Sequence, residues 1–396
     1  MPTLRAPTLR VPTTRVTKTR CALLFLLACG VALTGLPATA QTLLTTIPTG
    51  LHPVALAPNP ANGKLYVANQ YSANVTVIDE TTYATATIPV GSYPTDIAVN
   101  PVSNQIYVAN QNSATVMVID GVTSSTAIVA TGRSPVALAI NSVTNYIFVA
   151  NYNDNSVTAI NGSNNSTVTI AVGNYPMAIA LNSSTNKIYV ANLNSNTVTV
   201  IDGVTGNTAT VAVGSFPRAV AVNPLTNKIY VANATYFAGS TGTVTVIDGE
   251  TNSTTVVPTG LYPDALAINL ATNQIYVVNA GDGTVTAIDG ATNFTETIPV
   301  GSSPGLVAVD PVIDAIYVTD NLRNGSLTII DGATGSTTTV TVFGYPYAVA
   351  VDPANHHVYT ANLTDNSVAV IGNAGPPPAH WTAIRSCHSV PGCGHP

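Results

Sequence analysis

Three features of the sequence predict an all-β fold built from eight similar units. A short apolar run that begins with proline recurs, usually at a spacing of 41 residues, and is followed by a Tyr-Val-Ala-Asn-like tetrapeptide and an Ile-Asp-Gly-like turn. Within a unit, short segments of alternating apolar and small residues are separated by turn residues, as in antiparallel strands. A period of roughly 40 to 45 residues with four short strands is typical of a β-propeller blade.

The repeat landmarks keep step along the chain. The repeat prolines are Pro53, Pro94, Pro135, Pro176, Pro217, Pro263, Pro304 and Pro346. The tetrapeptides begin at Tyr66, Tyr107, Phe148, Tyr189, Tyr230, Tyr276, Tyr317 and Tyr359. Because all eight units share this pattern, we predict eight four-stranded antiparallel blades. The alternative is seven blades with one unit outside the ring, since seven is a frequent closure number for such repeats.

The second unit illustrates the strands of one blade. Alternation predicts strands over residues 95–100, 105–109, 115–119 and 125–130. The turn after the third strand begins with Asp120-Gly121, where glycine tolerates the backbone angles that tight turns require. One such sheet cannot bury its own apolar faces, so neighbouring blades must stack.

The two ends of the repeat region provide a closure for the ring. Residues 42–46 resemble a fourth strand that precedes any first strand, and the last unit ends after its third strand near Ile371. We therefore predict that Leu43–Ile47 pairs with Ser367–Ile371 and clasps the first blade to the last. The propeller domain is expected to span residues 41–372.

Residues 1–40 have the features of a secretory signal. Five of the 12 basic residues fall in the first 20 positions, the apolar run Cys21–Gly35 is short for a membrane span, and Ala38-Thr39-Ala40 offers small residues for cleavage. We expect cleavage after Ala40, export to the periplasm, the cell surface or the medium, and no transmembrane segment in the mature chain. Lipid attachment at Cys29 and a retained anchor are the alternatives.

Residues 373–396 form a tail that differs from the repeats. Pro376-Pro377-Pro378 indicates a stiff spacer. The following segment contains Cys387 and Cys393 without the spacing of a haem or zinc motif. We expect this tail to be disordered, with its two cysteines either incidental or joined in a disulfide in an oxidising compartment.

The charge of the chain argues against one class of partner. Without the leader, seven basic and 18 acidic residues remain, which gives a net charge of −11. A chain with no basic stripe cannot neutralise phosphates and release their counterions, so no nucleic-acid partner is expected.

Several segments resemble a known repeat. Lys187–Asn192, Thr197–Gly203 and Gly214–Pro217 are similar to the YVTN-type β-propeller repeat of bacterial exported and archaeal surface-layer proteins, and the resemblance covers about residues 42–372. It implies a propeller that is exported and that binds a partner or belongs to a cell surface. No catalytic motif accompanies this repeat, so the resemblance supplies no catalytic residue.

Strand order divides the loops of a propeller between two faces. We call top the face that carries the fourth-to-first and second-to-third connections, and bottom the face that carries the other two. Both insertions relative to the repeat, between Asn233 and Val244 and between Asp320 and Leu327, fall on the top. Variable loops on a rigid scaffold commonly carry binding specificity, so the top face is the candidate binding surface.

Aromatic residues on the top face are the candidate ligand-binding residues. The residue before the repeat proline is aromatic or histidine in six units, and the longer insertion adds two aromatic residues. Such side chains with polar neighbours hold sugars, peptides or flat ligands; the alternative is that they only pack against the proline. The candidates are His52, Tyr93, Tyr175, Phe216, Tyr262, Tyr345, Tyr236 and Phe237.

The repeats offer no catalytic, metal or cofactor motif. Gly301–Gly305 has the letters of a nucleophile elbow, but Pro304 lacks the backbone N–H that must follow the serine in such a site. Histidine is scarce in the repeats, with His52 on the top and His356 and His357 on the bottom. We therefore expect no shared metal site or proton relay.

These features favour an exported monomer that acts as a non-catalytic binding or cell-surface interaction module. Its partner is expected to be a protein, a glycan or a small ligand on the top face, with no cofactor. The alternative is a propeller-type hydrolase or lyase that acts at the mouth of the central channel with His52.

Overall fold

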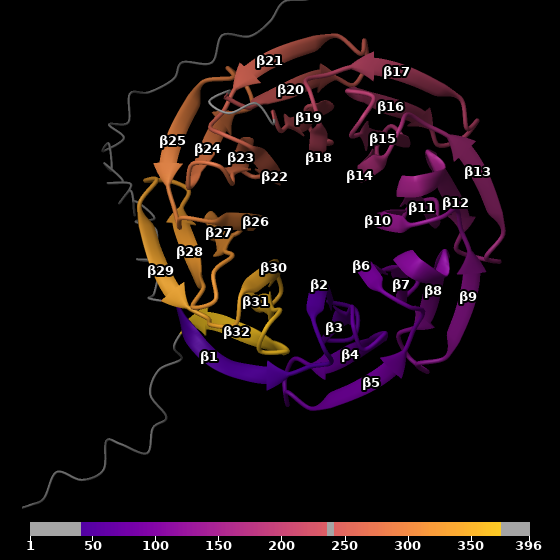
Figure 1. The fold of residues 1–396 in the computed structure, drawn as a ribbon, viewed down its shortest axis with the longest axis vertical. Helices are drawn as coiled ribbons and strands as arrows, with labels where there is room; N and C mark the ends of the chain where they lie inside the picture. The colour runs from indigo at the N-terminus through magenta and orange to yellow at the C-terminus, as the bar shows by residue number, and fades with distance from the viewer. Residues whose placement is uncertain (1–40, 236–240, 374–396) are drawn as a thin grey trace, which may run out of the picture. The chain divides into compact units, whose positions relative to one another are not determined.

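Residues 41–235 and 241–373 are described in a computed structural model, and they form eight four-stranded antiparallel sheets arranged as the blades of a propeller (Figure 1). The predictions of an all-β propeller and of eight rather than seven blades are confirmed. The predicted signal peptide, the predicted tail from residue 374 onward, and the candidates Tyr236 and Phe237 lie outside the described residues.

The first four blades follow the repeat directly. Blade 1 contains β2 (Pro53–Asn59), β3 (Lys64–Asn69), β4 (Asn74–Asp79) and β5 (Thr85–Pro89). Blade 2 contains β6 (Pro94–Asn100), β7 (Gln105–Asn110), the 3-10 helix η1 (Gln111–Ser113), β8 (Thr115–Asp120) and β9 (Thr126–Ala130). Blade 3 contains β10 (Pro135–Asn141), β11 (Tyr146–Asn151), the 3-10 helix η2 (Tyr152–Asp154), β12 (Ser156–Asn161) and β13 (Thr167–Ala171). Blade 4 contains β14 (Pro176–Asn182), β15 (Lys187–Asn192), β16 (Thr197–Asp202) and β17 (Thr208–Ala212).

The remaining blades complete the ring. Blade 5 contains β18 (Pro217–Asn223), β19 (Lys228–Asn233), β20 (Thr243–Asp248) and β21 (Thr254–Pro258). Blade 6 contains β22 (Pro263–Asn269), β23 (Gln274–Asn279), β24 (Thr284–Asp289) and β25 (Thr295–Pro299). Blade 7 contains β26 (Pro304–Asp310), β27 (Ala315–Asp320), β28 (Ser326–Asp331) and β29 (Thr337–Thr341). Blade 8 contains β30 (Pro346–Asp352), β31 (His357–Asn362), β32 (Ser367–Asn373) and the N-terminal strand β1 (Gln41–Pro48).

The N-terminal strand closes the ring as predicted. β1 runs antiparallel to β32, with Leu43 opposite Ile371 and Ile47 opposite Val368. The Ile47 side chain is 4% exposed and packs in the apolar cluster that joins blade 8 to blade 1. In Figure 1, indigo β1 lies beside yellow β32, so opposite ends of the repeat region complete one sheet.

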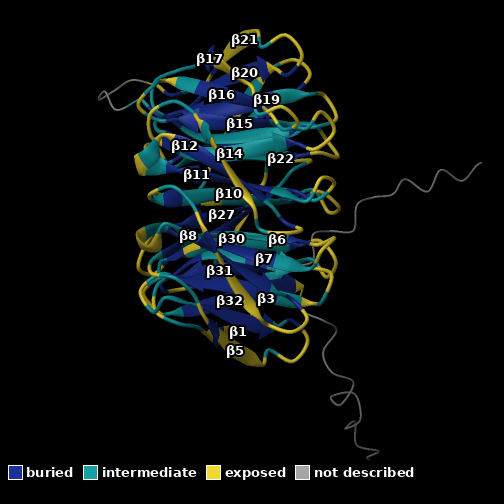
Figure 2. Cartoon of the chain, turned by 90° about the vertical axis from the view of Figure 1, so that its right-hand side faces the viewer, coloured by how far each residue is buried: buried dark blue, intermediate teal, exposed yellow. Residues whose placement is uncertain are grey.

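The described hydrophobic core consists of eight clusters, one at each junction between neighbouring blades. Figure 2 shows the buried strands between exposed loops. Side chains alternate between the two faces of a strand, so Tyr66 and Ala68 of β3 pack against Ile106 and Val108 of β7 in the next blade. The tetrapeptide recurs because the two faces of its strand must pack against the blades on either side.

The tetrapeptide tyrosines allow a matched test of their hydroxyl groups. Tyr107 donates a hydrogen bond of 2.7 Å to Gln105 Oε1, whereas the buried Tyr189 hydroxyl has no partner among the described residues. Phe148 occupies the same position in blade 3. We expect Tyr107→Phe to lower the free energy of unfolding by about 1 kcal/mol, and Tyr189→Phe to leave it unchanged or raise it by up to about 1 kcal/mol. Urea unfolding measures both values, and equal losses would contradict the assignment.

Each first strand lies nearest the axis and bulges just after its repeat proline. Figure 1 shows β2, β6, β10 and their equivalents innermost. In blade 3, Pro135 pairs with Asn151 and Ala137 pairs with Ala150, so the intervening residue is extra. The same shift occurs in six other blades, and in blade 7 the irregularity spans Gly305 and Leu306. A β-bulge redirects a side chain, so each of the other seven blades has one redirected residue at the top end of its innermost strand.

A ring of side-chain hydrogen bonds joins blades at the bottom face. The Asn that ends a first strand donates through Nδ2 to Oδ1 of an Asn in the next blade, from Asn59 to Asn104 at 2.7 Å and from Asn100 to Asn145 at 2.8 Å. The accepting residue has a positive φ, 52° at Asn104, which asparagine tolerates better than most residues. This requirement explains why Asn recurs at the accepting position, where blade 7 has Asp314 instead.

The ring changes where blade 8 meets its neighbours. Asp310 of blade 7 shares a hydrogen bond of 2.7 Å with His356 Nδ1 of blade 8. At the junction with blade 1, Asp352 replaces the donor Asn, and Gly63 replaces the acceptor Asn. Glu80 stands where blades 2 to 7 have glycine.

Glu80 fits at this junction because of the Gly63 replacement. In blade 2, a Cβ on Gly121 would collide with the Asn104 side chain, whereas Gly63, at the position of Asn104, has no side chain to obstruct Glu80. Glu80 is 8% exposed and Asp352 is 2% exposed. The closing junction therefore holds two buried carboxyl groups, where the ring elsewhere pairs Asn with Asn, Asn269 with Asp314, or Asp310 with His356.

No helix among residues 41–235 and 241–373 is long and apolar enough to cross a membrane.

Candidate functional site

Backbone hydrogen bonds tie the two top-face loops of each blade together. The Gln70 N–H donates to the His52 carbonyl in blade 1, and the Leu193 N–H donates to the Tyr175 carbonyl in blade 4, both at 2.9 Å. The residue before the repeat proline has a φ of 51–61° in seven blades, a region that few non-glycine residues occupy. Both loop types therefore share the top face, and the pre-proline residues have a structural role in joining them.

The predicted aromatic residues on blades 1 to 4 belong to two separate groups of rings. His52 stacks on Tyr71 with ring centroids 4.1 Å apart, and Tyr71 lies 6.1 Å from Tyr93. The Tyr175 ring lies 4.8 Å from the ring of Tyr152. Tyr71 and Tyr152 were not predicted from the sequence, although both lie in the second-to-third connections that were expected on this face.

The remaining described candidates belong to blades 5, 6 and 8. The Arg218 guanidinium lies 5.3 Å from the Tyr262 ring centroid, within the range of a cation–π contact. Phe216 and Tyr345 are both partly exposed. The pre-proline aromatic residues thus share one face, but their ring contacts fall into local groups.

Arg218 and Asp264 form an ion pair at the top end of the innermost strands. Both are the redirected residues that follow repeat prolines, in β18 and β22. Arg218 Nε donates to Asp264 Oδ1, and the two side chains are 21% and 28% exposed. A partly exposed pair between neighbouring blades can still contact a ligand.

Tyr347 brings a third functional group to this pair. It is the redirected residue of β30 and is 41% exposed. Its phenol pKa is raised by burial and then by the Asp264 carboxylate, with smaller influences from Arg218 and Tyr93. Blade 8 adjoins blades 7 and 1, whereas these groups belong to blades 6, 5 and 2. Tyr347 is therefore within electrostatic range of these groups from another side of the ring, and its phenol remains a hydrogen-bond donor at neutral pH.

We call Arg218, Asp264 and Tyr347 the axial cluster. Sequence reasoning missed all three because it considered the residue before each repeat proline, not the one after it. The signal is nevertheless present, since only Arg218 and Asp264 are charged at that position. Its eight residues are Val54, Thr95, Val136, Met177, Arg218, Asp264, Gly305 and Tyr347.

Asp96 adds another carboxyl group to an innermost strand, but its contacts are structural. Asp96 Oδ2 accepts a hydrogen bond of 2.8 Å from the Leu138 N–H of blade 3, and Oδ1 accepts one of 2.9 Å from the Ile97 N–H. Burial raises the Asp96 pKa to about 6, and these two N–H groups act against that rise. Asp96 thus joins blades 2 and 3.

The described histidines lie on opposite faces, as strand order predicts. His52 is on the top, where burial lowers its pKa and the neighbouring Gln70 side chain acts against that lowering. His356 pairs with Asp310 on the bottom, and burial lowers the pKa of His357 beside it. Within the described ranges, no group of three or more His, Cys, Asp or Glu residues is arranged to hold a metal ion.

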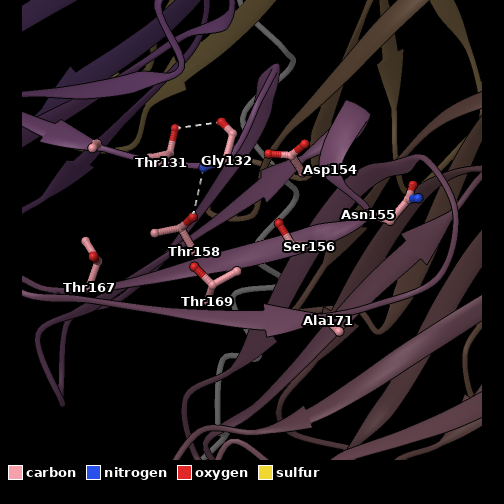
Figure 3. A pocket seen from close by; sticks show the side chains of 10 residues that line it. Thr131, Gly132, Asp154, Asn155, Ser156, Thr158, Thr167, Thr169 and Ala171 are labelled. Atoms are coloured by element: carbon pink, nitrogen blue, oxygen red, sulfur yellow. Dashed lines mark hydrogen bonds between the residues drawn. The ribbon is translucent and has the colours of Figure 1, made fainter.

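Blade 3 borders two hollows. The larger, about 630 Å³, lies between the loop after β9 and strands β12 and β13, and includes Asp154 and Asn155. Figure 3 shows the Gly132 N–H donating to Thr158 Oγ1 in its wall, at 3.3 Å. The same bond is formed by Gly50, Gly173 and Gly214, so much of this wall is ordinary blade structure.

Comparison with known proteins shows the fold. No family model and no curated protein sequence matches this chain. Among solved structures, the chain is similar to the hydrazine synthase of Kuenenia stuttgartiensis, at 18% identity and a TM-score of 0.56, over 75% of this chain and 97% of that chain. It is also similar to the Dos1 propeller, at 11% identity and a TM-score of 0.73, over 86% of this chain and 97% of that chain. These structures share the propeller fold with this chain.

Proposed function

We propose that this chain is an exported, non-catalytic β-propeller that binds a polar ligand at the axial cluster. The observation that carries the proposal is the partly exposed Arg218–Asp264 ion pair of blades 5 and 6 at the top end of the innermost strands, with the exposed Tyr347 of blade 8 within electrostatic range. The leader at residues 1–40 and the resemblance to the YVTN-type repeat support export.

The chemistry of the axial cluster favours a ligand with little net charge. Arg218 and Asp264 neutralise each other, so neither attracts a strongly charged ligand of one sign. Together they offer N–H donors and carboxylate acceptors, and Tyr347 adds a phenol donor and an aromatic face. Free amino acids and dipeptides carry matching donors, acceptors and opposite charges in one small molecule.

The local chemistry at His52 supports binding over the hydrolase or lyase alternative. General acid–base catalysis needs a positioned group that can exchange a proton with the substrate. His52 stacks on Tyr71, and the neutral Gln70 amide is the side chain that acts on its pKa. Neither neighbour provides the carboxylate that commonly orients a catalytic imidazole.

Replacement of the axial cluster by the residue used in other blades tests the proposal. Valine occupies the same position at Val54 and Val136, so Arg218→Val, Asp264→Val and Tyr347→Val together should preserve the fold. A thermal-shift screen with the common amino acids and a set of dipeptides should give at least one ligand that raises the melting temperature of the mature protein by several degrees. We expect that rise to disappear in the triple variant.

Met177→Val is the matched control for this screen. Met177 is the redirected residue of β14 and lies outside the axial cluster. This variant should respond to the same ligands as the unmodified protein. Equal responses in the triple variant, or no response by the unmodified protein to the whole panel, would overturn the proposal.

A further inference from the structure

A second group of aromatic and polar side chains lies on the top face where blades 3 and 4 meet. Its residues come from three segments of the chain: Arg133 from the connection into β10, Tyr152 and Asn153 from η2, and Asn174 and Tyr175 from the connection into β14. We call these five residues the platform. It shares no residue with the axial cluster.

The two tyrosines of the platform present an aromatic surface. Their ring centroids are 4.8 Å apart with planes inclined at 45°, so Tyr152 supports one side of Tyr175. Tyr175 is 37% exposed. Its φ of 55° and the hydrogen bond of 2.9 Å from its N–H to Asn155 Oδ1 fix its backbone. The accessible part of this ring is therefore held in one place.

Asp154 positions the guanidinium beside this surface. Its Oδ2 accepts a hydrogen bond of 2.6 Å from the Arg133 N–H, and its Oδ1 accepts one of 2.5 Å from Arg133 Nε. In blade 2 the equivalent hydrogen bond runs from the Ser92 N–H to Ser113 Oγ. Serine has a single side-chain oxygen, so it could not hold a guanidinium as well. Arg133 Nη2 also donates to the Asn153 carbonyl at 3.4 Å. The side chain is 75% exposed, so its other N–H groups can reach a ligand.

These side chains border a hollow of about 500 Å³. Its walls are Arg133, Asn153, Asn155, Asn174 and Tyr175. Amide and guanidinium groups supply donors and acceptors along the edge of one aromatic ring. Asp154 neutralises the charge of Arg133, so a strongly anionic ligand is disfavoured. An apolar ligand is disfavoured because the amide groups of the walls would lose their hydrogen bonds to water.

We propose that the platform binds a neutral saccharide. The apolar C–H face of a pyranose ring packs on Tyr175, while its hydroxyl groups exchange hydrogen bonds with Asn153, Asn174 and Arg133. This combination suits a sugar because the ring has an apolar face and a polar edge. The inference goes beyond the proposed function, since it assigns a different ligand class to different residues.

Titration of the mature protein, residues 41–396, with maltotriose, cellotriose and chitotriose tests the platform. Saturation-transfer NMR and calorimetry should detect at least one of the three, with a Kd of about 1 mM or tighter. Tyr175→Asn should weaken that binding at least tenfold, because asparagine tolerates the positive φ of this position but provides no ring. Tyr175→Phe should retain most of the affinity.

Tyr71→Asn is the matched control for loss of an exposed top-face ring. Tyr71 is 62% exposed, and blades 2 and 3 have Asn112 and Asn153 at its position. Saccharide affinity should be unchanged in this variant and in the axial triple variant, which separates the platform from the proposed amino-acid site. Absence of binding by all three trisaccharides, or equal losses in Tyr175→Asn and Tyr71→Asn, would overturn the proposal.

Discussion

Removal of residues 41–48 is expected to lower the melting temperature by about 10 °C or more, or to prevent cooperative folding. This segment is the outer strand of blade 8. Ile47 belongs to the buried cluster between blades 8 and 1, and Leu43 packs against the cluster between blades 7 and 8. Loss of their burial, at about 2 kcal/mol each, and of several backbone hydrogen bonds removes at least about 5 kcal/mol. That loss is comparable to the whole stability of many domains.

A peptide added in trans provides the control for this deletion. Because β1 contributes an edge strand, a synthetic peptide of residues 41–48 should bind the truncated protein by strand addition and raise its melting temperature. A scrambled peptide of the same composition should not. Differential scanning calorimetry measures both effects, and an unchanged melting temperature after the deletion would show that the clasp does not hold the ring closed.

Stability is expected to fall by about 2 kcal/mol between pH 6.5 and pH 8 because of Glu80. Burial is the largest cause that raises the Glu80 pKa from 4.5 to about 8, and the hydrogen bond and charge of Asp352 come next. Asn355 has a smaller lowering effect, and Asp79 a smaller raising effect. A raised folded-state pKa gives stability that is fully present below the unfolded value and is lost as the pH rises through the folded value. Each pH unit within that interval corresponds to about 1.4 kcal/mol.

The pH range for measuring the Glu80 effect begins at pH 6.5 because of His357. Burial lowers its pKa from 6.5 in the folded protein, so its protonation favours unfolding as the pH falls below that value. This effect opposes that of Glu80 in acid. The upper limit is set by tyrosines such as Tyr189 and Tyr317, whose pKa values are raised by burial to about 12; they add a further loss only above pH 10, where unfolded tyrosine ionises.

Glu80→Gln isolates the contribution of the closing junction. Glutamine keeps the size of the side chain and removes its titration, so the decline between pH 6.5 and pH 8 should disappear. Glu250→Gln is the matched control, since Glu250 is an exposed glutamate at the corresponding turn of blade 5. Urea unfolding at a series of pH values measures the slopes, and a decline of the same size in Glu80→Gln would contradict the role of the carboxyl pair.

The sequence was sufficient to predict the blades and the clasp because their signals are local and repeated. Every tetrapeptide meets the same neighbouring face, and the lone strand at the start matches the missing strand at the end. The carboxyl pair could not be predicted in the same way. Glu80 is visible as a departure from glycine, but its environment depends on Gly63 and on Asp352, which only ring closure brings close.

The candidate site was predicted only as far as its face. Strand order correctly placed the described pre-proline residues together on the top, yet it gave no information on which side chains meet. Arg218 and Tyr347 are far apart in sequence, and a bulge in each first strand redirects them. A shift in register of this kind arises from pairing with the next strand and is not visible in hydrophobic alternation.

The most direct test of ligand binding on the top face is a high-resolution crystal structure of the mature protein soaked with amino acids, dipeptides and trisaccharides. We expect density for an amino acid or dipeptide in contact with Arg218, Asp264 and Tyr347, and density for a sugar on Tyr175. Ligand density confined to the bottom face or the outer strands, with the axial cluster empty at saturating ligand, would contradict the proposed binding function.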